Sequence, residues 1–394
     1  MIPRVIHEHQ RVGWFELFYD LVIVATVGYA AHSFAHHPTW AFGFWICAWV
    51  LVMFVLWSLT TINHNLFPGD YTWRRLLGLG QMMALVVGAL GMVADEGLSS
   101  AAGFGGMGVA FACGAALYVV PLVRRMGDSP TTWLVAVCAV AGSIVLLGGT
   151  ALHDPVGWGP TDRAPYLLAV GVGIIGAGLF VAVGRLPALG DDEHLTERLG
   201  QLVIIVLGET FVSLMSALGG KPEIPNPLFM VLTFVVVFAV WSLYFSSVVP
   251  AGMPSGPWRL RAWYVMHWPL MFGAVGAAAG FSMVMLIPFG DEGTAATANW
   301  TTAPLAFVMA ALAVITWIGA GRITPQVRLH LFVVGTLVVL AVVDEFWTKT
   351  TANWEIAAGA VVVAADAYVS RRLDVPDRTS AALASAGVDP AGTD

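Results

Sequence analysis

Apolar residues form long, continuous runs along almost the whole chain. Each run has about 20 residues, the length that a helix needs to cross the roughly 30 Å hydrocarbon core of a bilayer. The runs do not alternate between apolar and polar positions, so strands are not expected, and lipid does not tolerate open sheet edges. The pattern predicts twelve membrane-spanning helices, at roughly 13–33, 41–62, 75–94, 101–123, 132–152, 165–184, 199–218, 227–249, 261–287, 302–320, 329–347 and 354–370.

Composition supports an all-α polytopic membrane protein whose main partner is the lipid bilayer. Hydrophobic residues make up 58% of the 394 positions and charged residues 11%, with a mean hydropathy of +0.79. Soluble domains carry about 25% charged residues, because their surface must face water. No basic surface dense enough for nucleic acid is visible, so no nucleic-acid partner is expected.

The basic residues predict the orientation of the chain in the membrane. With twelve spans, fifteen of the eighteen Lys and Arg residues fall on one side, and only Arg163, Lys221 and Lys349 fall on the other. Cytoplasmic loops carry the excess of Lys and Arg. Both termini are therefore predicted to be cytoplasmic.

Short sequence matches suggest an internal repeat. Trp57-Ser58-Leu59 recurs as Trp241-Ser242-Leu243, and the segment 16–24 resembles 197–205, which aligns Glu16 with Glu197. Two six-helix repeats in the same orientation would follow, related by an axis along the membrane normal; chance similarity among apolar helices is the alternative. The expected organisation is a cytoplasmic N-terminal segment 1–12, a first repeat 13–184, a cytoplasmic linker 185–198, a second repeat 199–372 and a disordered cytoplasmic tail 373–394.

Glu16 and Asp20 in the first span are four residues apart, which stacks both carboxylates on one helix face. Ionisable groups inside a membrane are costly and often functional. Two like charges this close would be relieved by a shared proton or a bound cation. The alternative is that Glu16 is solvated at the membrane interface and only Asp20 is buried.

Other ionisable residues lie within later spans. Glu209 is near the middle of the seventh span, so it should be protonated, paired across helices or exposed to a water-filled cavity. His267 precedes Pro269, which can kink the helix, and could bind a metal, relay a proton or simply form a core hydrogen bond. Asp366 in the last span and Glu197 before the seventh are further candidates.

Two patterns have simpler interpretations. His32, His36 and His37 at the end of the first span could bind a transition metal or lie in a solvated loop. The spacings from Gly273 to Ala277 and from Gly276 to Gly280 predict close helix packing.

Four segments have a distinctive sequence: 14–24 (WFELFYDLVIV), 194–209 (HLTERLGQLVIIVLGE), 241–245 (WSLYF) and 267–270 (HWPL). They resemble the bacterial low-temperature requirement protein A family, and the resemblance covers roughly residues 10–372. It implies a multi-pass protein of the bacterial cytoplasmic membrane, associated by name with growth in the cold. It implies no biochemical activity. Leu66 stands where the family commonly has an arginine, so no role of that arginine is carried over.

Our expectation is a polar cavity, open to the cytoplasm, that binds a proton, a cation or a small cationic solute through Glu16, Asp20, Glu209 and His267. Transport would occur by alternating access, with Glu209 or Asp20 as the titrating carboxylate. The alternatives are an intramembrane enzyme and a non-catalytic stress-related scaffold or sensor. The enzyme could use Glu16, Asp20 and His267 as weak metal ligands. The sequence identifies no cofactor and no oligomeric state.

Overall fold

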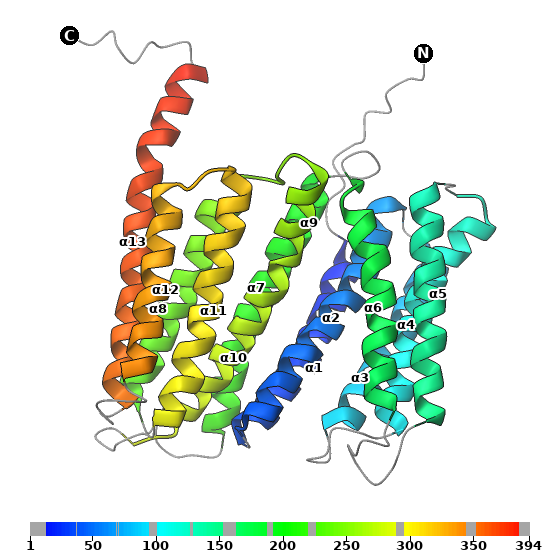
Figure 1. Cartoon of the computed structure of the whole chain (residues 1–394), viewed down its shortest axis with the longest axis horizontal. Helices are drawn as coiled ribbons and strands as arrows, with labels where there is room; N and C mark the ends of the chain where they lie inside the picture. Colours follow the sequence, from blue (N-terminus) through cyan, green and yellow to red (C-terminus); the bar gives the residue numbers. More distant parts are fainter. Residues whose placement is uncertain are drawn as a thin grey trace. The chain divides into compact units, whose positions relative to one another are not determined.

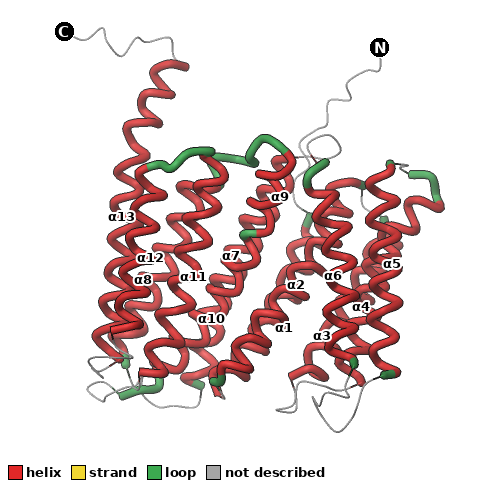
Figure 2. Tube along the Cα trace, viewed as in Figure 1, coloured by secondary structure: helices red, strands yellow, loops and turns green. Residues whose placement is uncertain are grey.

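The computed structural model of the chain is helical throughout the parts that it describes. These parts are residues 13–36, 38–67, 69, 71–93, 101–126, 129–152, 163–186, 192–219, 226–288, 295–343 and 352–385. Figure 2 shows helices joined by short loops over this part of the chain. The predicted fold class, an all-helical protein, is confirmed there.

The helices follow the predicted spans closely, as labelled in Figure 1. Their bounds are α1 Trp14–His36, α2 Trp40–Leu66, α3 Thr72–Val93, α4 Ala101–Val123, α5 Pro130–Ala151, α6 Ala164–Val183, α7 Asp192–Leu218, α8 Pro227–Leu243, the π-helix η2 Tyr244–Val248, α9 Pro257–Val265, α10 His267–Met285, α11 Ala295–Ala320, α12 Pro325–Val343 and α13 Ala352–Ser385.

Ten candidate membrane spans meet the requirements of length and apolar composition within the described residues. They do not include α3 and α13, so the total of twelve spans stays a prediction. The ten candidate spans are enough to make the chain a multi-span membrane protein.

Polar side chains fix where several helices begin. The hydroxyl oxygens of Thr39 and Ser129 accept hydrogen bonds from backbone N–H groups at the starts of α2 and α5, and the amide oxygen of Asn226 does so at α8. Such caps satisfy donors that have no partner inside the helix. Polar residues between the apolar runs therefore set the helix boundaries.

The ninth predicted span, 261–287, is broken. α9 ends at Val265 and α10 begins at His267, so Met266 separates two helices. Pro269 lies in the first turn of α10, where a missing backbone N–H costs little, and its ring would clash with the carbonyl of residue 265 in a continuous helix. Met266 keeps right-handed helical backbone angles (φ −65°, ψ −13°), so the predicted kink is a one-residue interruption within a single candidate span.

Two boundaries of the expected domain organisation, at the end of the linker and at the start of the tail, fall inside helices. α7 begins at Asp192, so the second half of the expected linker 185–198 forms the first turns of a helix. α13 continues beyond residue 372, through much of the expected tail, to Ser385. The expected segment 1–12 and residues 386–394 lie outside the described residues.

The chain divides into two compact units. Unit 1 contains residues 1–209 and 255–264, and unit 2 contains residues 210–254 and 265–394. The division falls inside α7 and not between 184 and 199. Compactness and internal similarity are different properties, so the six-helix repeat stays a prediction.

Each unit has its own pattern of helix packing. In unit 1, α3 packs on α4, α4 on α5 and α5 on α6, while α1 packs on α2 and α3 (Figure 1). The core of unit 1 includes the fully buried side chains of Trp49, Trp57 and Tyr118. In unit 2, α10 packs on α11, α11 on α12, and α13 on both α12 and α8.

Small residues allow α10 and α11 to approach closely. A Cβ atom added at Gly273 would lie 2.8 Å from the backbone nitrogen of Val308 and 2.9 Å from the carbonyl oxygen of Pro304. A Cβ atom at Gly280 would lie 2.5 Å from the carbonyl oxygen of Trp300. The close helix packing predicted for these glycines is confirmed.

Replacing Gly273 by Ala should therefore destabilise unit 2, because the backbone of α11 has to move. Overpacking of this kind costs about 1–3 kcal/mol. The thermal unfolding midpoint of the purified protein in detergent measures the effect. The control is Gly335→Ala, since a Cβ atom at Gly335 has no neighbouring atom within 4 Å. Equal midpoints for the two variants would contradict close packing at Gly273.

Candidate functional site

Glu16 and Asp20 occupy one face of α1, as their spacing predicts, and both are buried. Their exposed fractions are 5% and 0%. Gly28 lies about two turns beyond Asp20 on α1 and is rotated from it by about 80°, because successive helical residues turn by about 100°. Glu16 is therefore not a solvated residue at the surface of unit 1.

Arg198 on α7 forms a buried ion pair with Asp20. Its Nη1 donates to Oδ2 of Asp20 over 2.7 Å, and its Nη2 donates to Oδ1 over 2.7 Å. The indole Nε1 of Trp57 donates to Oδ1 over 2.8 Å, and the guanidinium group lies 5.6 Å from the Trp57 ring centroid. Three donors from two helices thus satisfy the carboxylate of Asp20.

Glu16 lies between two nitrogen atoms of α7 at slightly longer range. Its Oε1 is 3.5 Å from Nε2 of His194 and 3.6 Å from Nε of Arg198. Its Oε2 accepts a hydrogen bond of 2.8 Å from the backbone N–H of Gly13. These distances place Glu16, His194 and the Asp20–Arg198 pair in one group, which we call the unit 1 charge cluster.

Arg198 supplies the positive charge that sequence reasoning assigned to a shared proton or a bound cation. For Asp20 that expectation is wrong, because both carboxylate oxygens accept from the guanidinium. Arg198 was missed because it was counted as a cytoplasmic linker residue in the charge asymmetry. A usable signal was present: His194 and Arg198 are four residues apart, as are Glu16 and Asp20, so the two helix faces are complementary.

Glu209 contacts α1 at Gly28, where the absence of a side chain leaves room for its carboxylate. A Cβ atom added at Gly28 would overlap the carboxylate of Glu209, whose exposed fraction is 8%. Gly28 lies about 12 Å along α1 from Asp20 at a rise of 1.5 Å per residue. Glu209 therefore packs against the backbone of α1, farther along that helix than the charge cluster.

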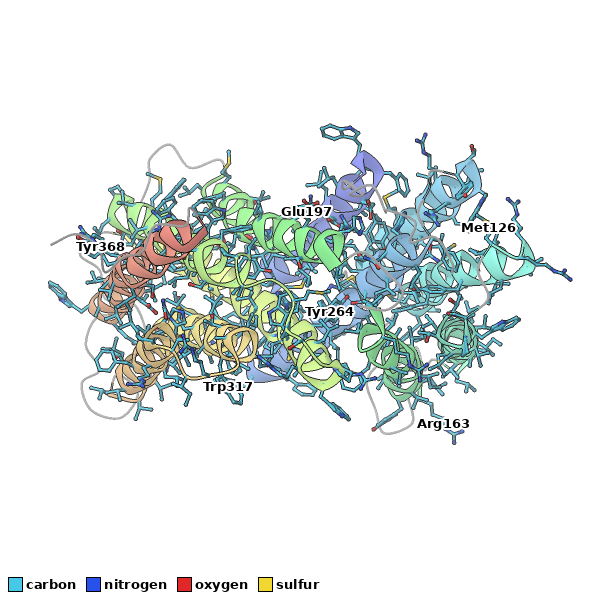
Figure 3. All side chains as sticks on the ribbon, turned by 90° about the horizontal axis from the view of Figure 1, so that it is seen from above. Met126, Arg163, Glu197, Tyr264, Trp317 and Tyr368 are labelled. Atoms are coloured by element: carbon cyan, nitrogen blue, oxygen red, sulfur yellow. The ribbon has the colours of Figure 1, made fainter. Side chains whose placement is uncertain are left out.

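Further hydrogen-bonded polar side chains of unit 1 lie on α1, α2, α3 and α9. The hydroxyl of Thr60 lies 3.3 Å from the hydroxyl of Tyr19 and 3.1 Å from Oε1 of Gln81. The hydroxyl of Tyr264, which is labelled in Figure 3, donates to Ser58 over 2.7 Å. All of these residues are buried within unit 1.

Glu197, the other candidate on α7, is partly exposed. It directly precedes Arg198, and successive residues on a helix point about 100° apart. Glu197, labelled in Figure 3, thus projects from a different face of α7 than Arg198 does.

The remaining two candidates belong to unit 2. His267 is fully buried, and its Nε2 lies 3.0 Å from the hydroxyl of Tyr244. Tyr244 begins the π-helix η2, and His267 follows the break between α9 and α10. Irregular helical geometry is frequent at functional sites.

Asp366 on α13 is part of a buried polar triad. Its Oδ2 is 2.7 Å from Nδ1 of His330 on α12, and its Oδ1 accepts a hydrogen bond of 2.9 Å from Ser370. Nε2 of His330 has no hydrogen-bond partner among the described residues. His330 was missed because a single histidine in an apolar run gives no pattern of its own.

The described residues contain no group of three His, Cys, Asp or Glu side chains that could hold a metal ion. Glu16, Asp20 and Glu209 lie in unit 1, where Glu209 contacts α1 about two turns beyond Asp20, whereas His267 and Asp366 lie in unit 2.

Apolar helices that enclose charged side chains define a multi-pass membrane protein. The model of the family described as bacterial low temperature requirement A protein (LtrA) matches residues 11–365. The chain belongs to this family, and the resemblance seen in the sequence is confirmed. Among curated proteins and among solved structures, no match to the chain was found.

The ion pair predicts strong coupling between its two members. Arg198→Met should destabilise unit 1 by about 3–5 kcal/mol, because it leaves the Asp20 carboxylate buried without its counter-charge. Combining it with Asp20→Leu should regain most of that loss, since the pair then carries no charge. Thermal unfolding of the single and double variants measures the coupling. Arg185→Met is the control, because Arg185 is hydrogen-bonded to Thr131 and to no carboxylate among the described residues. Additive losses in the double variant would show that the pair is not coupled.

Proposed function

We propose that this protein is a proton-coupled membrane transporter whose proton site lies in the unit 1 charge cluster. The observation that carries the proposal is the burial of Glu16, Asp20 and Arg198 together in the first two turns of the apolar helices α1 and α7. Charges inside a membrane bundle are costly, and they commonly mark ion pathways and proton relays. A purely structural contact between these helices would need no charged side chains, because well-packed apolar side chains often stabilise a buried position as well as an ion pair does, or better.

The charge balance of the cluster favours a proton. Two carboxylates and one guanidinium leave one excess negative charge when His194 is neutral. A buried net charge is unfavourable unless it is compensated. One proton, held by His194 or by Glu16, makes the cluster neutral, and releasing it restores the charge.

The residues of the cluster have different roles in binding and releasing this proton. Glu16 and His194 hold the transferable proton, since their side chains lie 3.5 Å apart and either can carry it. Asp20 and Arg198 hold α1 and α7 together through their direct contact. Glu209, against Gly28, is a second carboxylate that can bind a proton farther along α1.

A scaffold without turnover is the second candidate, and one observation favours it. Asp20 is fully hydrogen-bonded by Arg198 and Trp57, as a structural cross-link between helices would be. The two candidates differ at Glu16. A scaffold tolerates a neutral amide there, whereas a proton site does not.

Currents recorded on a solid-supported membrane after a pH jump test the proposal. Proteoliposomes with the unaltered protein should give a transient current as protons bind, even without a solute. Glu16→Gln should abolish most of this current, because the amide cannot take up a proton. Glu197→Gln, which changes a partly exposed carboxylate on α7, should leave the current intact. A current that is absent in the unaltered protein, or unchanged in Glu16→Gln, would favour the scaffold.

A further inference from the structure

Two histidines lie one turn apart at the C-terminal end of α1, away from the charge cluster. Nε2 of His32 and Nε2 of His36 are 3.3 Å apart, and the ring centroids are 4.7 Å apart. His36 is exposed and His32 is half-buried. The two nitrogen atoms therefore converge at the surface of unit 1.

The separation of these nitrogens fits a shared metal ion. Zinc binds imidazole nitrogen at about 2.0–2.1 Å, and a tetrahedral angle of about 109° then separates two ligand nitrogens by about 3.3–3.4 Å. The observed 3.3 Å falls in this range. Hydrogen bonds donated by N–H groups to oxygen are usually shorter, about 2.7–3.2 Å.

We propose that His32 and His36 form a binding site for a divalent transition metal, with Zn²⁺ as its reference ion. Imidazole ligands suit Zn²⁺, Cu²⁺ and Ni²⁺, whereas Mg²⁺ and Ca²⁺ require oxygen ligands. Histidines four residues apart project from the same helix face, which is the spacing that places two zinc ligands on one helix in HExxH motifs. The described residues hold no third ligand of this kind nearby, and His37, the third histidine of the predicted pattern, lies outside them. Water would fill the coordination positions that the protein leaves open.

Metal binding at this position would stabilise the end of α1. His36 is the last residue of the helix, where backbone carbonyls lack partners within the helix. An ion held by residues 32 and 36 cross-links the last turn to the one before it. The site is separate from the proton site, so its presence or absence leaves the proposed function untouched.

Zinc titration of the full-length protein, purified without a polyhistidine tag, tests the site. Isothermal titration calorimetry should show one Zn²⁺ bound per chain at this site. His32→Gln and His36→Gln should each weaken it by at least about tenfold, and the double variant should lose it. Ser33→Ala, a change between the two histidines, is the matched control and should bind as the unaltered protein does.

A second readout separates a bound ion from a hydrogen bond between two imidazoles. Hydrogen exchange of the last turn of α1 should slow on addition of zinc in the unaltered protein and in Ser33→Ala, but not in the double variant. Absence of saturable zinc binding would overturn the proposal and leave only the hydrogen bond. Zinc binding that is identical in the double variant would overturn it as well, because other histidines would then be the ligands.

Discussion

The contact between Asp20 and Arg198 constrains the rest of unit 1. Each charge loses several kcal/mol of hydration on burial, and only close, well-oriented pairing offsets that loss. The two guanidinium nitrogens donate to the two carboxylate oxygens, so the contact fixes both the distance and the rotation of α7 against α1. The indole of Trp57 brings α2 into the same arrangement. The consecutive helices α1 and α2 and the distant helix α7 thus depend on one pair of side chains.

The apolar pattern predicted the helices well, because length and hydropathy alone decide which segments can cross a bilayer. The segment 101–123 was predicted with the bounds that α4 has, despite its many glycines. Three features of the structure were not predicted. The first turns of α7 carry polar residues that pair within the protein, so by composition they resemble a loop. Arg198 was used only to predict the orientation of the chain, and no partner for its charge was predicted. The π-helix at Tyr244 has no sequence signature that we could have used.

Each unit buries an aspartate, and the two aspartates have different partners. Asp20 in unit 1 pairs with arginine, whose charge is permanent, whereas Asp366 in unit 2 pairs with His330, whose charge depends on bound protons. The expected candidates Asp20 and Asp366 were both found buried. The spacing of His194 and Arg198 offered a signal for the partner of Asp20, whereas the apolar run around His330 offered none for the partner of Asp366. Partners on other helices depend on tertiary packing, which a periodic pattern within one helix does not encode.

Gly28 has a consequence for how α7 could slide. Glu16 and Asp20 are one turn apart, so moving α7 by about 5.4 Å along α1 would bring Arg198 opposite Glu16 and offer it a second carboxylate. The same movement would carry Glu209 from Gly28 towards Val24, whose side chain fills the space that glycine leaves open. The missing Cβ at position 28 therefore gives the Glu209 carboxylate a space that is not available at position 24. It makes the two electrostatically similar registers sterically unequal.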